Sequence, residues 1–188
     1  TILGYPTISI CPPSNRPYPQ DTRGVVQHEA CGHGFGKLAD ENVVEFEWPK
    51  NTVKDGIMGY QSIGWYQNIS LDSKYNSVPW ADFIFDPNYS DRVDIFEGAC
   101  GYMRGVFRSE QNSCMNYGIP YFNTISRKDI CKRILTYGGK NFTMDYFYAN
   151  DTFEWGSTGN ATRALEVDCN AYTSSNTHVS PIMVDPKR

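Results

Sequence analysis

The feature that most constrains this chain is a pair of histidines, His28 and His33, five positions apart in the run Q-H-E-A-C-G-H-G-F-G. The chain has 3 histidines in all, and Glu29 directly follows the first of this pair. A metal-dependent hydrolase needs imidazoles on one face of a helix and a carboxylate close to the water that the metal activates. The usual pattern is H-E-x-x-H, in which histidines four residues apart face the same way.

The five-residue spacing departs from that pattern. In a regular α-helix it turns the second imidazole roughly 140° away from alignment with the first. A π-bulge can absorb one extra residue in a helix, and Gly32 would ease the distortion. We therefore predict a helix over residues 23–35, N-capped by Asp21 or Thr22, with a π-bulge or break at residues 30–32. The competing interpretation is a helix with two unrelated histidines.

A catalytic zinc site needs a third protein ligand and an open fourth position. Gly34 and Gly36 allow the helix to end and the chain to reverse after the second histidine. The nearest residues beyond that reversal that can bind a metal are Asp40 and Glu41. We expect Asp40 to be the third ligand and Glu41 to orient one of the histidines, with Glu41 itself and the remote His178 as the alternative ligands.

Elsewhere the residue patterns predict short strands. Alternation or β-branched runs favour strands at residues 7–10, 43–48 and around 63–69. The stretch 49–98 is rich in Gly, Pro, Asn, Asp and Tyr, and we expect loops with short elements there.

The C-terminal half carries one clear helix signal. Ser126 and Asp129 resemble a capping box, an apolar face follows, and Gly138 is expected to end the helix. Residues 95–107 mix glycine and aromatic side chains and support no firm assignment. The tail from residue 140 is polar and aromatic, which favours irregular or short β structure.

Composition excludes several classes of protein. The chain has 188 residues, of which 40% are hydrophobic and 14% aromatic, so a folded domain is expected rather than a disordered one. The net charge is -4 without a basic stripe, which argues against a nucleic-acid partner. No apolar run is long enough to span a membrane. The chain lacks a signal peptide and an initiator Met, so we interpret it as a piece of a longer protein.

Cysteines and sequons bear on the compartment. Six cysteines permit three disulfides, but their spacing favours no pairing, and free buried thiols are an equal alternative. The absence of a CxxC motif argues against a thiolate zinc cage. Glycosylation sequons of the N-x-S/T type suit an exported surface, and they begin at Asn68, Asn88, Asn141, Asn150 and Asn160.

The run H-E-A-C-G-H-G-F-G-K-L-A-D-E resembles the active-site segment of the IgA-specific metallopeptidase family and its Bacteroides-type relatives. Three other segments strengthen the resemblance: the opening L-G-Y-P-T-I-S-I-C-P-P-S-N, the block F-E-G-A-C-G-Y-M-R-G-V-F-R-S-E-Q-N-S-C-M-N, and I-P-Y-F-N with S-R-K-D-I-C-K-R-I. Together they cover roughly residues 3–135. The family also carries an extra residue between its histidines.

The resemblance implies an α+β fold: a metzincin-like zinc peptidase catalytic domain with a twisted sheet, an active-site helix, a Met-turn and a C-terminal helix. It implies one such domain over residues 1–188, with 140–188 unmatched, and a further N-terminal domain outside this chain. The implied protein is bacterial and is secreted, on the cell surface or in the periplasm. Its substrate would be a protein or peptide, not necessarily IgA.

Metzincin-like proteins also suggest roles for individual residues. A Gly three residues after the second histidine, here Gly36, lets the chain turn back, and their usual third-ligand slot falls on Ala39, which cannot bind a metal. The segment S-C-M-N-Y would be the Met-turn, with Met115 beneath the metal. Tyr117 would bind the metal or the oxyanion that forms during attack.

These observations favour a zinc-dependent endopeptidase with Glu29 as the general base. One alternative is a non-catalytic binding module on a metallopeptidase fold, and another is a metal-dependent hydrolase of small amides or esters. Cys31 raises two further readings, because its thiolate could bind the metal or pair with a histidine as in cysteine proteases. The latter would leave Glu29 and the second histidine unexplained.

Overall fold

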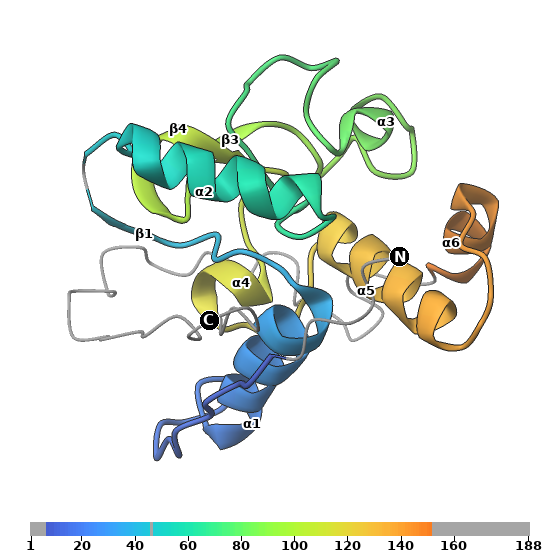
Figure 1. The fold of residues 1–188 in the computed structure, drawn as a ribbon. Coiled ribbons are helices and arrows are strands. Elements are labelled where there is room, and N and C mark those ends of the chain that lie inside the picture. The colour runs from blue at the N-terminus through green and yellow to red at the C-terminus, as the bar shows by residue number, and fades with distance from the viewer. Residues whose placement is uncertain (1–6, 46, 152–188) are drawn as a thin grey trace. The chain divides into compact units, whose positions relative to one another are not determined.

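The computed structural model describes residues 7–45 and 47–151 (Figure 1). The chain divides into two compact units, one essentially of residues up to 141 and one that begins at Phe142. The first unit contains α1 (Thr22–Val26), η1 (Gln27–Gly36), β1 (Val43–Glu45), α2 (Asn51–Ser62), β2 (Ile69–Ser70), α3 (Ala81–Ile84), β3 (Phe96–Ala99), β4 (Gly101–Arg108), α4 (Cys114–Tyr117) and α5 (Thr124–Tyr137). The second contains α6 (Met144–Asn150).

The first unit is built on a small mixed sheet, so the α+β class is confirmed. Strand β4 is its centre: it pairs in parallel with β1 and antiparallel with both β2 and β3. The turn from β3 to β4 passes through Cys100 and Gly101, whose φ angles are 53° and 83°. Glycine adopts such angles without steric cost.

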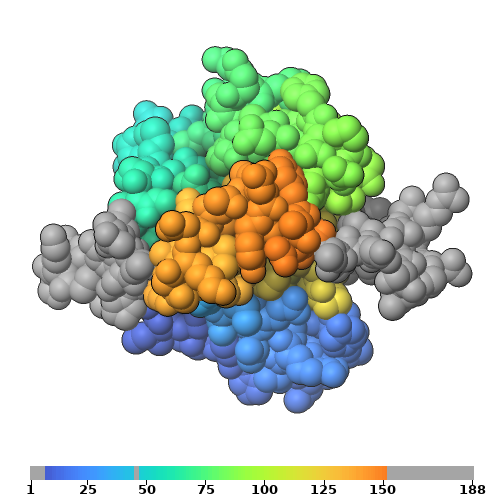
Figure 2. Space-filling view, turned by 90° about the vertical axis from the view of Figure 1, so that its right-hand side faces the viewer, coloured from blue at the N-terminus to red at the C-terminus, as the bar shows by residue number. Residues whose placement is uncertain are grey.

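The hydrophobic core joins the sheet to α2 and to the segment that follows η1. Ile57 of α2, Ile69 of β2 and Val106 of β4 are buried in one cluster, and Ala39 belongs to the same cluster. The space-filling view shows the blue segment with α1 and η1 on one side of this unit and the teal and green segments with α2 and α3 on the other (Figure 2). Residues 38–41 are thus anchored in the core between η1 and β1.

The predicted helix over residues 23–35 is confirmed as α1 followed by η1. Asp21 is its N-cap, and its side chain accepts hydrogen bonds from the backbone N–H groups of Arg23 and Gly24. The predicted strand at residues 7–10 is wrong. Thr7 and Ser9 instead donate hydroxyl hydrogen bonds to carbonyl oxygens of η1.

Residues 49–98 were expected to form loops with short elements, but they include helix α2. The strand predicted around residues 63–69 is also wrong, because only Ile69–Ser70 form a strand there. Gly56 and Gly59 lie inside α2, where glycine is unfavourable, and the helix tolerates them because Ile57 packs into the core. The strand predicted over residues 43–48 is shorter, with β1 covering Val43–Glu45.

The predicted C-terminal helix exists as α5, but its cap differs. Asn123, rather than Ser126, is the N-cap and accepts a hydrogen bond from the Ser126 N–H, while Gly138 is the C-cap as predicted. Of the tail from residue 140, for which irregular or short β structure was expected, Met144–Asn150 form helix α6, and residues 152–188 lie outside the described part of the chain. Within the described ranges, no helix combines the length and hydropathy that crossing a membrane requires.

Candidate metal centre

The two histidines lie on the π-helix η1. In a π-helix the backbone hydrogen bonds connect residues five apart, so His28 and His33 fall on the same side one turn apart. Their rings meet edge to face, with centroids 4.8 Å apart. The predicted π-distortion is confirmed, but it extends over Gln27–Gly36 instead of residues 30–32 alone.

Asp40 completes a cluster of donor atoms. Its Oδ1 atom lies 3.2 Å from His28 Nε2 and 3.4 Å from His33 Nε2. Potential ligand atoms of the three residues all lie within 4.8 Å of one another, so the group could hold a metal ion.

The distances allow a direct test of fit. With bonds of about 2.05 Å to nitrogen and oxygen, two ligands at neighbouring corners of a tetrahedron are about 3.3 Å apart. The two His–Asp distances of 3.2 and 3.4 Å match this value. Two of the three ligand pairs thus have the spacing of a tetrahedral metal site, and three protein ligands would leave a fourth position for another ligand.

Backbone carbonyls orient both imidazoles. His28 Nδ1 lies 2.8 Å from the Cys114 carbonyl oxygen, and His33 Nδ1 lies 2.8 Å from that of Leu38. A proton on each Nδ1 satisfies these contacts and leaves Nε2 with its lone pair toward Asp40. Burial alone lowers the pKa of His33, but the hydrogen bond and charge of Asp40 outweigh it, so the net pKa is raised.

Met115 lies against the middle of η1 and is fully buried. A Cβ atom added to Gly32 would meet Met115 Sδ and lie 3.0 Å from its Cε atom. The absent side chain at position 32 is what lets α4 approach η1 so closely. This approach puts Met115 in contact with the helix that carries the histidines, and it also brings the Cys114 carbonyl to His28.

The remaining predicted residues are placed as follows. Glu29 is buried on η1 and lies between the two histidines in the sequence, and its charge acts on His33. Tyr117 ends α4 and is half-buried. Cys31 is exposed and is not part of the donor group, so the structure does not support Cys31 as a metal ligand. His178 lies outside the described residues.

The role expected of Glu41 is wrong. Its carboxylate is directed away from the histidines to three other side chains and accepts hydrogen bonds from Asn68, Ser113 and Asn123. Burial raises the pKa of Glu41 to about 7, and hydrogen bonds from these three side chains oppose the rise. The carbonyls of Cys114 and Leu38 orient the histidines in its place.

Asn68, Ser113 and Asn123 were not predicted to contribute to the site. Asn68 begins a sequon, but its side chain is fully buried and donates to Glu41 Oε1 and to the Ala39 carbonyl. The sequon interpretation is therefore wrong for Asn68, whereas Asn88, Asn141 and Asn150 are exposed.

The described cysteines bear on the open question of disulfides. Cys11, Cys31, Cys100 and Cys114 carry free thiols. Burial raises the pKa of Cys100 to about 11 and that of Cys114 to about 12, which keeps these two thiols protonated at neutral pH.

Comparison with models of known protein families and with curated proteins finds no match to this chain. The interpretation of the site therefore depends on its own geometry and on the sequence motif.

Proposed function

We propose that this chain is a zinc-dependent endopeptidase with a metzincin-like catalytic domain, in which His28, His33 and Asp40 hold the metal. The observation that carries the proposal is the convergence of two Nε2 atoms on Asp40 Oδ1 at distances suited to tetrahedral ligands. The resemblance of the H-E-A-C-G-H-G-F-G-K-L-A-D-E run to a metallopeptidase active site supports it. That resemblance also makes an exported bacterial protein the expected context.

Zinc is the metal that best suits this donor set, because imidazole nitrogen and a single carboxylate favour it in three-ligand catalytic sites. When bound, zinc would polarise the substrate carbonyl and lower the pKa of a water in the open position to about 7. Glu29 sits next to His28 on the same helix and would accept that water's proton and deliver it to the leaving amine. Tyr117, on α4, would donate a hydrogen bond to the carbonyl oxygen as charge develops on it.

Metal content tests the ligand set. We expect the purified protein to carry about one zinc per chain by elemental analysis, and His28→Ala, His33→Ala and Asp40→Ala each to lose it. Asp129→Ala is the matched control, because Asp129 is an equally buried aspartate on α5 that faces Lys128. Wild-type zinc content in the histidine variants would refute the site, and loss of zinc in His178→Ala would move the third ligand to the tail.

Hydrolysis tests the catalytic assignment. Glu29→Gln should retain zinc and lose peptide hydrolysis by a factor on the order of 100 or more. Tyr117→Phe should lower kcat by a smaller factor and leave zinc content unchanged. Activity of Glu29→Gln equal to that of the wild type would exclude Glu29 as the base. A zinc-loaded wild type that cleaves no peptide in a broad library would favour the non-catalytic binding module.

A further inference from the structure

The side chain of Glu41 is fully buried one residue beyond Asp40. Its Oε1 atom accepts hydrogen bonds of 2.9 Å from the side-chain amides of both Asn68 and Asn123. Its Oε2 atom accepts another of 2.9 Å from Asn123 and a short one from the Ser113 hydroxyl. The donors come from three separate segments: the turn before β2, the residue before α4 and the N-cap of α5.

The hydrogen bonds around Glu41 act on Asp40, His33 and His28 through the backbone of neighbouring residues. Asp40 is the neighbour of Glu41 in the chain, so fixing one restricts the other. The Asn68 side-chain amide also holds Ala39, because it accepts a hydrogen bond from the Ala39 N–H and donates one to the Ala39 carbonyl oxygen. The preceding residue is Leu38, whose carbonyl orients His33.

The same hydrogen bonds also restrict the orientation of the His28 ring. Ser113 precedes Cys114, whose carbonyl oxygen lies against His28 Nδ1. A backbone hydrogen bond of 2.8 Å from the Glu41 N–H to the Met115 carbonyl is a second connection between the segment of Glu41 and α4. The Glu41 carboxylate thus connects the segment that contains Asp40 to the start of α4, where the Cys114 carbonyl orients His28.

We infer that Glu41 is the positioning residue of the metal centre: its carboxylate holds Asp40 and the two orienting carbonyls in the geometry that a metal requires. This inference rests on the proposed metal site. A carboxylate is required because every side-chain partner donates a hydrogen bond, so a glutamine amide at this position would set its N–H groups against those of Asn68 or Asn123.

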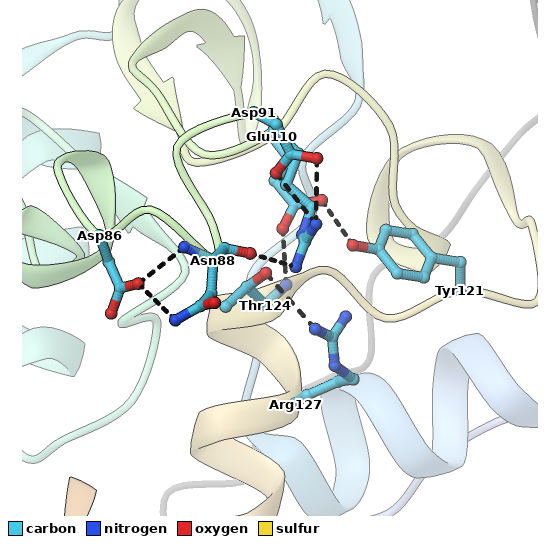
Figure 3. Close-up of polar contacts among 8 residues, drawn as sticks. Asp86, Asn88, Asp91, Glu110, Tyr121, Thr124 and Arg127 are labelled. Carbon is cyan, nitrogen blue, oxygen red and sulfur yellow. Dashed lines mark hydrogen bonds and ion pairs between the residues drawn. The ribbon is translucent and has the colours of Figure 1, made fainter. Parts of the chain in front are cut away.

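Metal affinity separates this role from a general contribution to folding. Glu41→Gln should bind Zn²⁺ roughly 10–100-fold more weakly in competition with a chromophoric chelator, the range typical for residues that support metal ligands. The visible absorption spectrum of the Co²⁺-loaded protein should also change, because the ligand geometry changes. Glu110→Gln is the matched control: Glu110 is also a buried glutamate and accepts from Tyr121 Oη and the Thr124 N–H (Figure 3).

Glu110→Gln should lower the stability of the metal-free protein and keep wild-type Zn²⁺ affinity and the wild-type Co²⁺ spectrum. A folded Glu41→Gln with wild-type affinity and spectrum would overturn the inference, and so would an equal loss of affinity in Glu110→Gln. If Glu41→Gln does not fold, Ser113→Ala decides: a severalfold loss of affinity is expected, and unchanged affinity overturns the inference. A wild type that binds neither metal would instead refute the proposed metal site.

Discussion

Gly32 is a position of the π-helix at which a side chain would collide with the protein core. A Cβ atom there would lie 3.0 Å from Met115 Cε, closer still to Met115 Sδ, and 3.6 Å from Phe122 Cε1. Met115 is fully buried and cannot move into solvent. Such overpacking costs about 1–3 kcal/mol, whereas replacing glycine by alanine gains about 0.4–1 kcal/mol through the unfolded chain. Gly32→Ala should therefore lower the free energy of unfolding by about 1–2 kcal/mol.

Urea unfolding followed by tryptophan fluorescence measures this change as a shift of the midpoint at constant slope. The matched control is Gly56→Ala, because Gly56 is also helical and a Cβ atom there would meet nothing within 4 Å. That variant should gain about 0.4–1 kcal/mol. The two alanine variants should thus differ by about 2 kcal/mol, or roughly 30-fold in the unfolding equilibrium.

Equal effects of the two substitutions would refute the argument that Met115 fills the space at Gly32. A second test uses Met115→Ala, which removes the clash. In that background Gly32→Ala should become nearly neutral, giving a coupling free energy of about 1–2 kcal/mol in a double-mutant cycle. Additive effects would show that the cost arises from the π-helix backbone and not from the methionine.

Three further predictions concern pH, the helix cap and glycosylation. Burial lowers the pKa of Lys37 from 10.5 to about 8, so the unfolded Lys37 binds more protons between these values and its contribution to the free energy of unfolding should rise with pH across this window. In denaturant titrations from pH 7 to 10.5, the free energy of unfolding of the wild type minus that of Lys37→Met should therefore rise, while the raised pKa values of Cys100 and Cys114 lower the stability of both proteins above pH 9. Asp21→Ala removes the side-chain cap of α1 and should cost about 1 kcal/mol in the same assay, with no change expected in the slope. When the protein is secreted from a eukaryotic host, mass spectrometry of the folded product should find glycan on the exposed Asn88 and none on the fully buried Asn68.

The local part of the site was predictable because its signals lie close together in the chain. The run from Asp21 to Asp40 contains the cap, the histidine pair, the flanking glycines and the carboxylate. The five-residue spacing of the histidines itself predicts a π-distortion if both are to face one ligand. That prediction is confirmed, although the π-helix is longer than expected and spans Gln27–Gly36.

The supporting part of the site was not predictable, because its contacts connect residues far apart in sequence. Glu41 was expected to face a histidine because it follows Asp40, and nothing near it in the chain indicates Asn68, Ser113 or Asn123 as partners. Helix α2 was not predicted for a related reason. Its two interior glycines lower its intrinsic helix propensity, and the burial of Ile57 against β2 and β4 compensates only in the folded protein.

The span of these contacts has a consequence for the order of events in folding. His28, Glu29, His33 and Asp40 lie within a short stretch, yet their supports close loops of 72, 82 and 86 residues. Loops of this length close late, since their entropy must be overcome before the contacts can stabilise anything. A peptide cut from this stretch would contain all the donor atoms and lack their arrangement. The geometry of the centre is therefore a property of the completed fold, and tight, selective chelation would report that the last long-range contacts have formed.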